Sequence, residues 1–276
     1  MKIIADTATL FAPSEGEAQG MTIVPVCVTI NNMTYKDYAE VSSDQFLKLI
    51  EEGGIPTSSQ PALGDMLDIF ESSDEEMLVL TVGDGLSGGY QTAMGARNCA
   101  DDRERIHVIN SKTLAGPLRY LAKKAVVLKE RGLTIDKIKE ELSRSIESSV
   151  SFVIPEDFEF LKRSGRLTSF TAKVGGALKL IPVLTQTEDK TRIRPIAIKR
   201  TWKTAVDTII QRLQSLGVDQ DYLISVSHAG TYQKAVSVLK QIKTVFASSE
   251  TEILTLSPAL ITHGGPGCIV IQAIRK

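Results

Sequence analysis

The chain has 276 residues, a formal net charge of −1 at pH 7, 42% hydrophobic residues and 24% charged residues. This composition is typical of a globular protein, and its near-neutral charge offers no basic surface for a nucleic-acid partner. The three cysteines, Cys27, Cys99 and Cys268, are too widely separated for a metal site or a disulfide framework, and they fit a reducing cytoplasm. We therefore expect a cytoplasmic protein that binds neither metal nor nucleic acid.

Apolar runs along the chain are short. The longest lies near residues 21–30 and is interrupted by Pro25, whereas a membrane-spanning helix needs about 20 apolar residues. The first apolar run reaches Asp6 too early for a signal peptide. We expect no stable membrane insertion.

Strand-like and helical patterns alternate through the first half of the chain. Ser42 and Gln45 have the spacing of a capping box at a helix start, and Gly53 or Gly54 marks the end of the same helix. Such alternation predicts a mostly parallel sheet covered by helices. In chain order we expect strands at about residues 2–5, 22–30, 77–82 and 106–110, and helices at about residues 42–52, 61–70, 88–98, 114–130 and 134–147.

The pattern changes near Ser151, which we interpret as a boundary between a domain at residues 1–150 and a domain at residues 151–276. Two β-type runs flank the polar turn at residues 188–190 and predict a hairpin. We then expect a helix at about residues 204–216, a strand at 222–230, a helix at 232–246 and two final strands. The sequence thus predicts an α/β fold of two α/β domains, the first with a mostly parallel sheet and the second with a mixed sheet.

A glycine-rich loop, GDGLSGGYQTA at residues 83–93, joins a predicted strand to a predicted helix. Gly83, Gly85 and Gly88 match the GxGxxG spacing of dinucleotide-binding loops. No lysine of a phosphate-binding loop follows, however, and Asn110 ends the next strand, where a ribose-binding acid is expected. We do not favour a nucleotide site here.

The same loop also matches the GxSxG pattern of a nucleophile elbow, centred on Ser87. A hydrolase also requires a histidine, and His228 and His263 each follow a strand-like run near a glycine. His107 lies inside an apolar strand and is most simply structural. A serine hydrolase of acyl esters, using Ser87 with His263 or His228, is therefore an alternative hypothesis.

A third interpretation is an anion-binding site. Ser87 precedes one predicted helix, and Thr57, Ser58 and Ser59 precede another. Backbone N–H groups and the helix dipole favour a negative group at helix starts, although serine and threonine are also common N-caps. Two hydroxyl-bearing helix starts that converge would suit one carboxylate. A module that binds a sugar or a phosphate at the same helix starts is a further alternative.

Six short motifs in this order resemble the DegV family, bacterial fatty-acid-binding proteins that include the acyl-binding subunit of fatty acid kinase. The resemblance covers essentially the whole chain. The motifs are DT at 6–7, PTSSQP at 56–61, SGGYQTA at 87–93, LKRSGRL at 161–167, LKLIPVL at 178–184 and HGGPG at 263–267.

The resemblance implies a non-catalytic carrier without a cofactor, which holds one fatty acid of about sixteen to eighteen carbons in a buried tunnel near the domain junction. It implies that the carboxylate is presented to the catalytic subunit of a fatty acid kinase, for an acyl phosphate used in phospholipid synthesis. By motif, the carboxylate-binding residues are Ser58, Ser87 and Thr57, with His263 and Arg200 behind them, and Arg166 lies on the kinase-docking surface.

The physical requirements of such a ligand are clear. Each buried methylene contributes about 0.8 kcal/mol, and a buried carboxylate needs hydrogen bonds or a cation. We expect His263 to change charge near neutral pH and Arg200 to stay protonated. Apolar residues that line either the tunnel or the core are Ile4, Val26, Val28, Phe158, Leu161, Leu178, Leu180 and Ile181.

Overall fold

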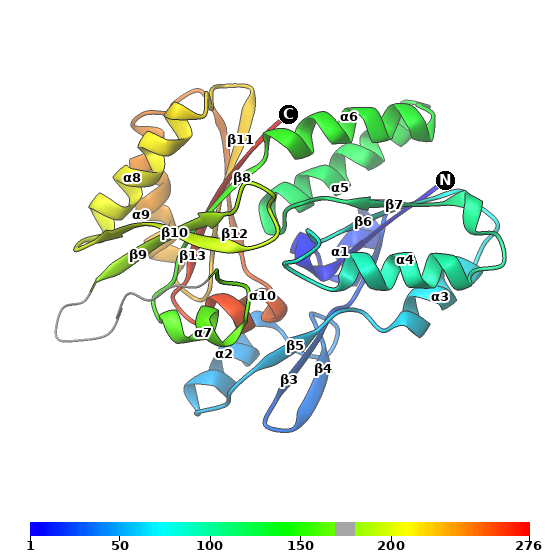
Figure 1. Cartoon of the computed structure of the whole chain (residues 1–276), viewed down its shortest axis with the longest axis horizontal. Coiled ribbons are helices and arrows are strands. Elements are labelled where there is room, and N and C mark those ends of the chain that lie inside the picture. Colours follow the sequence, from blue (N-terminus) through cyan, green and yellow to red (C-terminus); the bar gives the residue numbers. More distant parts are fainter. Residues whose placement is uncertain (169–179) are drawn as a thin grey trace.

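The computed structural model describes residues 1–168 and 180–276, and within them the strands form three sheets (Figure 1). The first sheet is parallel and its order is β2-β1-β6-β7. Its strands are β1 (Lys2–Asp6), β2 (Thr22–Val24), β6 (Met77–Thr81) and β7 (Ile106–Asn110). The mostly parallel N-terminal sheet predicted from the sequence is confirmed.

Helices cover both faces of this sheet because its central strands carry apolar residues on both sides. On one face, Ile4 and Val79 pack against α3 (Leu63–Glu71) and α4 (Gly89–Cys99). On the other face, Ile3 packs with side chains of α5 (Ala115–Glu130) and α6 (Ile135–Ser148). Continuous burial of this kind is characteristic of parallel sheets.

The second sheet is mixed, with the order β10-β9-β8-β13-β11-β12, and also confirms the prediction. The expected hairpin is present as β9 and β10, which pair antiparallel. Helices α8 (Trp202–Ser215) and α9 (Tyr232–Lys243) cover its outer face (Figure 1). The strands are β8 (Val150–Ile154), β9 (Ile181–Gln186), β10 (Ile193–Lys199), β11 (Tyr222–His228), β12 (Glu250–Thr255) and β13 (Ile269–Arg275).

The inner face of the second sheet rests on α5 and α6, and α5 also contacts β1 and β6 of the first sheet. One apolar core joins the two halves, since Leu223 of β11 and Ile274 of β13 pack with Leu118 and Leu121 of α5. The two sheets therefore share a helical layer.

The third sheet is small and antiparallel, in the order β4-β3-β5, and it corrects two predictions. The single strand expected at 22–30 is two strands in different sheets, because Pro25 lacks the N–H needed to continue the ladder. The segment PTSSQP is an edge strand rather than a turn at a helix start. The strands are β3 (Cys27–Ile30), β4 (Met33–Lys36) and β5 (Thr57–Ser59).

Several short helices were not expected from the sequence. Helix α10 lies between the third sheet and α7, and it also contacts α2, whose capping box of Ser42 and Gln45 is formed as predicted. The short helices are α1 (Pro13–Ala18), α7 (Phe158–Arg163), α10 (Pro258–Gly264) and the 3₁₀ turns Thr7–Thr9 and Arg103–Arg105, while α2 spans Ser43–Glu51. In the two described ranges, every helix is too short or too polar to cross a bilayer.

Candidate functional site

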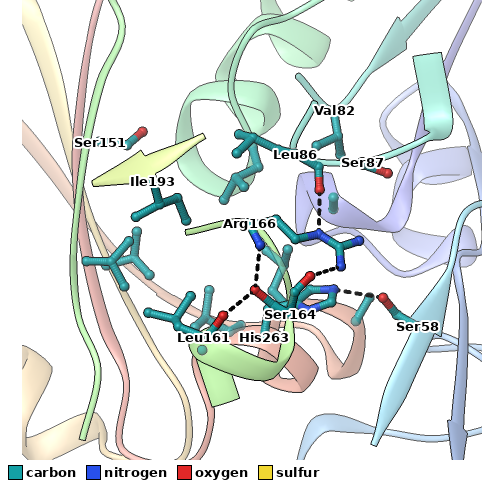
Figure 2. Close-up of a pocket in the computed structure, with 18 of the residues that line it drawn as sticks. Ser58, Val82, Leu86, Ser87, Ser151, Leu161, Ser164, Arg166, Ile193 and His263 are labelled. Carbon is teal, nitrogen blue, oxygen red and sulfur yellow. Dashed lines mark hydrogen bonds between the residues drawn. The ribbon is translucent and has the colours of Figure 1, made fainter. Parts of the chain in front are cut away.

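A pocket of about 120 Å³, measured as the space open to the centre of a water molecule, lies where the three sheets meet. Figure 2 shows its walls, which come from distant parts of the chain. Most of the lining is apolar, whereas the hydroxyls of Ser58 and Ser87, one imidazole and one guanidinium lie toward one end. The apolar walls include Val26, Val82, Leu114, Val153, Ile193 and Leu260.

Ser58 and His263 meet at the polar end of the pocket. Ser58 lies on β5 and His263 on α10, and the distance from Ser58 Oγ to His263 Nε2 is 2.8 Å (Figure 2). Ser257 caps the start of α10 by accepting a hydrogen bond from the N–H of Leu260, and Pro258 occupies the first turn. Sequence analysis named both residues as parts of one site. It expected His263 to follow a strand, whereas His263 lies in a helix.

The imidazole of His263 is neutral. Burial, together with the positive charge of Arg166, lowers its pKa to about 4. The ring lines the pocket, and no acidic side chain of the described residues lines it as well. The prediction that His263 changes charge near neutral pH is therefore wrong for the unliganded protein, because desolvation disfavours the imidazolium.

Arg166 lies in the pocket wall rather than on an exposed docking surface. Its Nε donates to the carbonyl of Leu86 at 3.1 Å, and its Nη1 donates to the carbonyl of Ser164 (Figure 2). The backbone carbonyl of Arg166 accepts a hydrogen bond from the N–H of Ile193 at 2.9 Å, which ties the loop after α7 to β10. The side chain is half-buried, and this burial lowers its pKa.

No carboxylate of the described ranges forms an ion pair with Arg166. An arginine stays protonated even when partly buried, so its charge needs compensation from elsewhere. The guanidinium thus makes the polar end of the pocket attractive to an anion.

Ser87 also lines the pocket, just before α4. Its Oγ accepts a hydrogen bond from the N–H of Gly89 at 3.2 Å, which leaves the hydroxyl proton free for another acceptor. No histidine of the described residues forms a hydrogen bond with it, and the Nε2 of His263 bonds Ser58 instead. Ser87 also lacks the positive φ of a strained turn, so the nucleophile-elbow geometry is not formed.

Two of the predicted carboxylate-binding residues lie elsewhere. Thr57 is exposed on the edge strand β5 and does not line the pocket. Arg200 is exposed after the end of β10 and is also absent from the lining. Alternation along β5 turns Thr57 away when Ser58 points inward, and Arg200 follows a strand at the outer edge of its sheet.

The predicted tunnel walls are only partly pocket walls. Val26 and Leu161 line the pocket. Ile4 and Val28 belong to buried core clusters instead. Leu178 lies outside the described residues, and the remaining three, Phe158, Leu180 and Ile181, are half-buried without lining the pocket.

Sequence reasoning missed the role of Arg166 within the pocket, although the turn LKRSGRL was singled out. Gly165 adopts a φ of +69°, which reverses the chain after α7 and directs the next residue inward. In the sequence, the arginine directly after Gly165 was the feature that could have indicated a cation directed into the pocket. In the described residues no group of three acidic, histidine or cysteine side chains suits a metal ion.

Comparison with known proteins agrees with this geometry. Residues 1–276 match the family model described as uncharacterised protein, DegV family. A DegV domain-containing protein of Clostridium acetobutylicum is 28% identical over 98% of this chain and 96% of its own length.

Solved structures show the same fold. A structure of a DegV family protein from Thermus thermophilus, described by its fatty acid binding, has a TM-score of 0.88 at 22% identity and covers 100% of this chain and 99% of its own. A DegV family protein from Ruminococcus gnavus, solved with vaccenic acid, has a TM-score of 0.88 at 22% identity over 98% of both chains. The family match spans every residue, and we conclude that this chain belongs to the DegV family.

Proposed function

We propose that the protein binds one long-chain fatty acid, of about sixteen to eighteen carbons, in the pocket beside Ser58 and Ser87. The observation that carries the proposal is the half-buried guanidinium of Arg166, which faces an apolar pocket and has no acidic partner in the described ranges. A carboxylate is the simplest ligand that neutralises this charge and still leaves an apolar tail for the walls.

The polar end offers matched hydrogen-bond donors. Ser87 has a free hydroxyl proton, and Ser58 has one as well when the Nε2–H of His263 donates to its Oγ across 2.8 Å. Hydrogen bonds to a charged group contribute about 1.5–3 kcal/mol each, which offsets the desolvation of a carboxylate. The bound anion raises the pKa of His263, because it adds a negative charge near the ring.

The tail supplies most of the affinity in this proposal. At about 0.8 kcal/mol for each buried methylene, even a partly enclosed chain outweighs the cost of ordering it. The Thermus thermophilus relative is described by its fatty acid binding and the Ruminococcus gnavus relative was solved with vaccenic acid, and both descriptions support the same class of ligand.

We further propose that the protein is a non-catalytic carrier that presents the carboxylate to a kinase in the cytoplasm. A carrier of this kind leaves chemistry to its partner, which suits a site with hydrogen-bond donors but no general base. His263 is a poor base because its pKa is about 4, and no acid of the described residues orients its ring. The acyl phosphate would then supply phospholipid synthesis.

The first experiment is mass spectrometry of lipid extracted from the purified protein. We expect one fatty acid per chain, and reduced occupancy in Ser58→Ala and Ser87→Ala. Ser215→Ala is the matched control, because Ser215 is an exposed serine at the end of α8 that does not line the pocket. Empty wild-type protein that also fails to bind added palmitic acid contradicts the proposal.

A second experiment separates the carrier from the hydrolase. A fluorophosphonate probe labels activated serines, and we expect Ser87 and Ser58 to remain unlabelled. Stoichiometric labelling of either serine, abolished by His263→Ala, would establish the hydrolase instead. For the presentation step, ATP and a fatty acid kinase catalytic subunit should form acyl phosphate only when the loaded carrier is present.

A further inference from the structure

The pocket has a second polar region, at the end away from Ser58. Ser151 of β8 and Gln186 of β9 line this region, and Figure 2 shows Ser151 across the pocket from Ser58. The sequence analysis assigned neither residue to the binding site. A tunnel for a plain hydrocarbon tail is expected to end among apolar side chains, so polar groups at its far end call for a physical reason.

The polar region coincides with the end of the β8–β9 ladder in the six-stranded sheet. Strands β8 and β9 pair only at Phe152 with Thr185 and at Val153 with Leu184. Ser151 and Gln186 are the next residues beyond the first of these pairs, where the ladder stops. A second cavity lies at the same place and shares Ser151, Thr185 and Gln186 with the pocket. We call these three residues the neck, because they separate the two cavities.

Hydrogen bonds hold the neck in place. Gln272, which is fully buried, donates through Nε2 to Ser151 Oγ at 2.8 Å and to the carbonyl of Leu114 at 3.0 Å. Thr185 donates to the carbonyl of Ser151 at 2.8 Å. Gln186 donates through Nε2 to the carbonyl of Lys112 at 3.0 Å. The orientation of both pocket-facing groups is therefore fixed before a ligand arrives.

These bonds leave one donor and one acceptor unused. Ser151 accepts from Gln272, so its own proton is free, and no acceptor for it lies within the part of the chain that the structure describes. Gln186 uses its amide nitrogen, and nothing in the same ranges donates to its Oε1. Both side chains are uncharged, so a second carboxylate would find no counterion in the neck.

We propose that the neck recognises a hydroxyl group on the tail of the bound fatty acid, so that hydroxylated long-chain acids are a preferred ligand class. A hydroxyl accepts a hydrogen bond from Ser151 and donates one to Gln186, which completes both unused positions. A methylene at the same place leaves both unpaired, and sites built for a hydroxyl discriminate strongly against analogues that lack it. This inference rests on the proposed function, because it concerns the tail of the same ligand.

The test compares palmitic acid with its α-hydroxy, mid-chain hydroxy and ω-hydroxy derivatives, by competition against a fluorescent fatty acid. In Ser151→Ala and in Gln186→Met, we expect the affinity for the mid-chain or the ω-hydroxy acid to fall about tenfold, the size of one to two net hydrogen bonds. Palmitic acid and the α-hydroxy acid should keep their affinities, because neither reaches the neck with a hydroxyl. Ser151→Thr should restore binding of the hydroxylated acid.

Ser227→Ala is the matched control, since Ser227 is a buried serine of the same sheet that does not line the pocket. The inference is overturned if neither tail-hydroxylated acid loses more affinity in Ser151→Ala than palmitic acid does. It is also overturned if the Ser227→Ala control produces the same loss. Palmitic acid binding to the wild type tests the proposed function separately, so the two failures are distinguishable.

Discussion

Arg166 and Arg200 show at the scale of single residues what a sequence motif does and does not determine. Both were identified as functional cations, but Arg166 faces the pocket and Arg200 is exposed beyond it. The direction of a side chain depends on the turn that carries it, and here the turn at Gly165 is held by hydrogen bonds to β10. Such long-range contacts cannot be read from local spacing.

Replacement of Arg166 by methionine should weaken fatty acid binding by about tenfold to a hundredfold, because one charge-assisted contact is worth about 1.5–3 kcal/mol. The methyl ester of the same acid carries no charge, so it should bind the wild type and the variant about equally. Isothermal titration with both ligands measures the difference. Arg131→Met, which removes an exposed arginine at the end of α5, is the control. Equal losses for acid and ester would mean that Arg166 only packs the loop.

Asp37 is a second residue whose position has a measurable consequence. It is fully buried, and burial, aided by the charge of Asp6, raises its pKa to about 7. The hydroxyls of Thr7 and Ser257 and the N–H of Ala259 lie near enough to oppose this shift, but none reaches hydrogen-bond geometry with the carboxyl oxygens. The protein therefore folds best with Asp37 protonated.

The folded pKa of Asp37 is above its ordinary value of 3.8, so its stabilising contribution is complete below about pH 4 and is lost as the pH rises through 7. Asp37→Asn removes this ionisation. The variant should match the wild type near pH 4 and exceed its free energy of unfolding by about 2–4 kcal/mol above pH 8. Urea denaturation at several pH values measures this. A variant that is less stable at every pH would show that the carboxylate is paired in solution.

At the scale of elements, long periodic segments were predictable and short ones were not. The helices α5 and α6 and the hairpin of β9 and β10 follow directly from apolar spacing and turn residues. Helix α10 and strand β5 have too few residues for a period to be recognised, and they form because distant segments pack against them: β5 pairs with β3, and α10 lies against α7, α2 and the third sheet. The polar end of the site is built on these two elements, so the sequence named its serine and histidine but not their geometry.

Gly265 controls how closely α7 approaches α10. It has a φ of +76° and a ψ of 166°, a region accessible to glycine almost alone, and a Cβ atom there would lie 2.6 Å from the ring of Phe160. Gly265→Ala should lower the free energy of unfolding by about 2–4 kcal/mol, from backbone strain plus the clash. It should also weaken fatty acid binding, because α10 carries His263 and α7 leads to Arg166.

Gly132 provides the control for this prediction. It has the same φ of +76°, but a Cβ atom there would meet nothing within 4 Å. Gly132→Ala should therefore cost only about 1 kcal/mol and leave ligand affinity unchanged. Thermal unfolding and ligand titration of both variants measure the two effects. Equal destabilisation would show that backbone strain alone matters and that the contact with Phe160 relaxes freely.

At the scale of the whole molecule, the division at residue 150 stays a prediction, and the apolar core bears on it. The first core cluster contains Leu118 and Leu121 of α5 together with Leu223 and Ile274 from the second half. A composition change marks the boundary in the sequence, but no local pattern reveals which faces of α5 are covered by which sheet. We expect the two halves to unfold as one cooperative unit, since separating them exposes this shared layer to water.

Two probes test this expectation in one protein. Trp202 is the single tryptophan and lies at the start of α8, whereas Cys99 is an exposed thiol at the end of α4 that accepts a fluorescent label. Their urea unfolding curves should have coincident midpoints. Ile274→Ala, which removes a fully buried side chain that packs with α5, should lower the free energy of unfolding by about 2–5 kcal/mol. The urea midpoints of both probes should fall together. Midpoints that separate, with the Cys99 signal unaffected by the substitution, would instead establish two independently folding domains joined through α5.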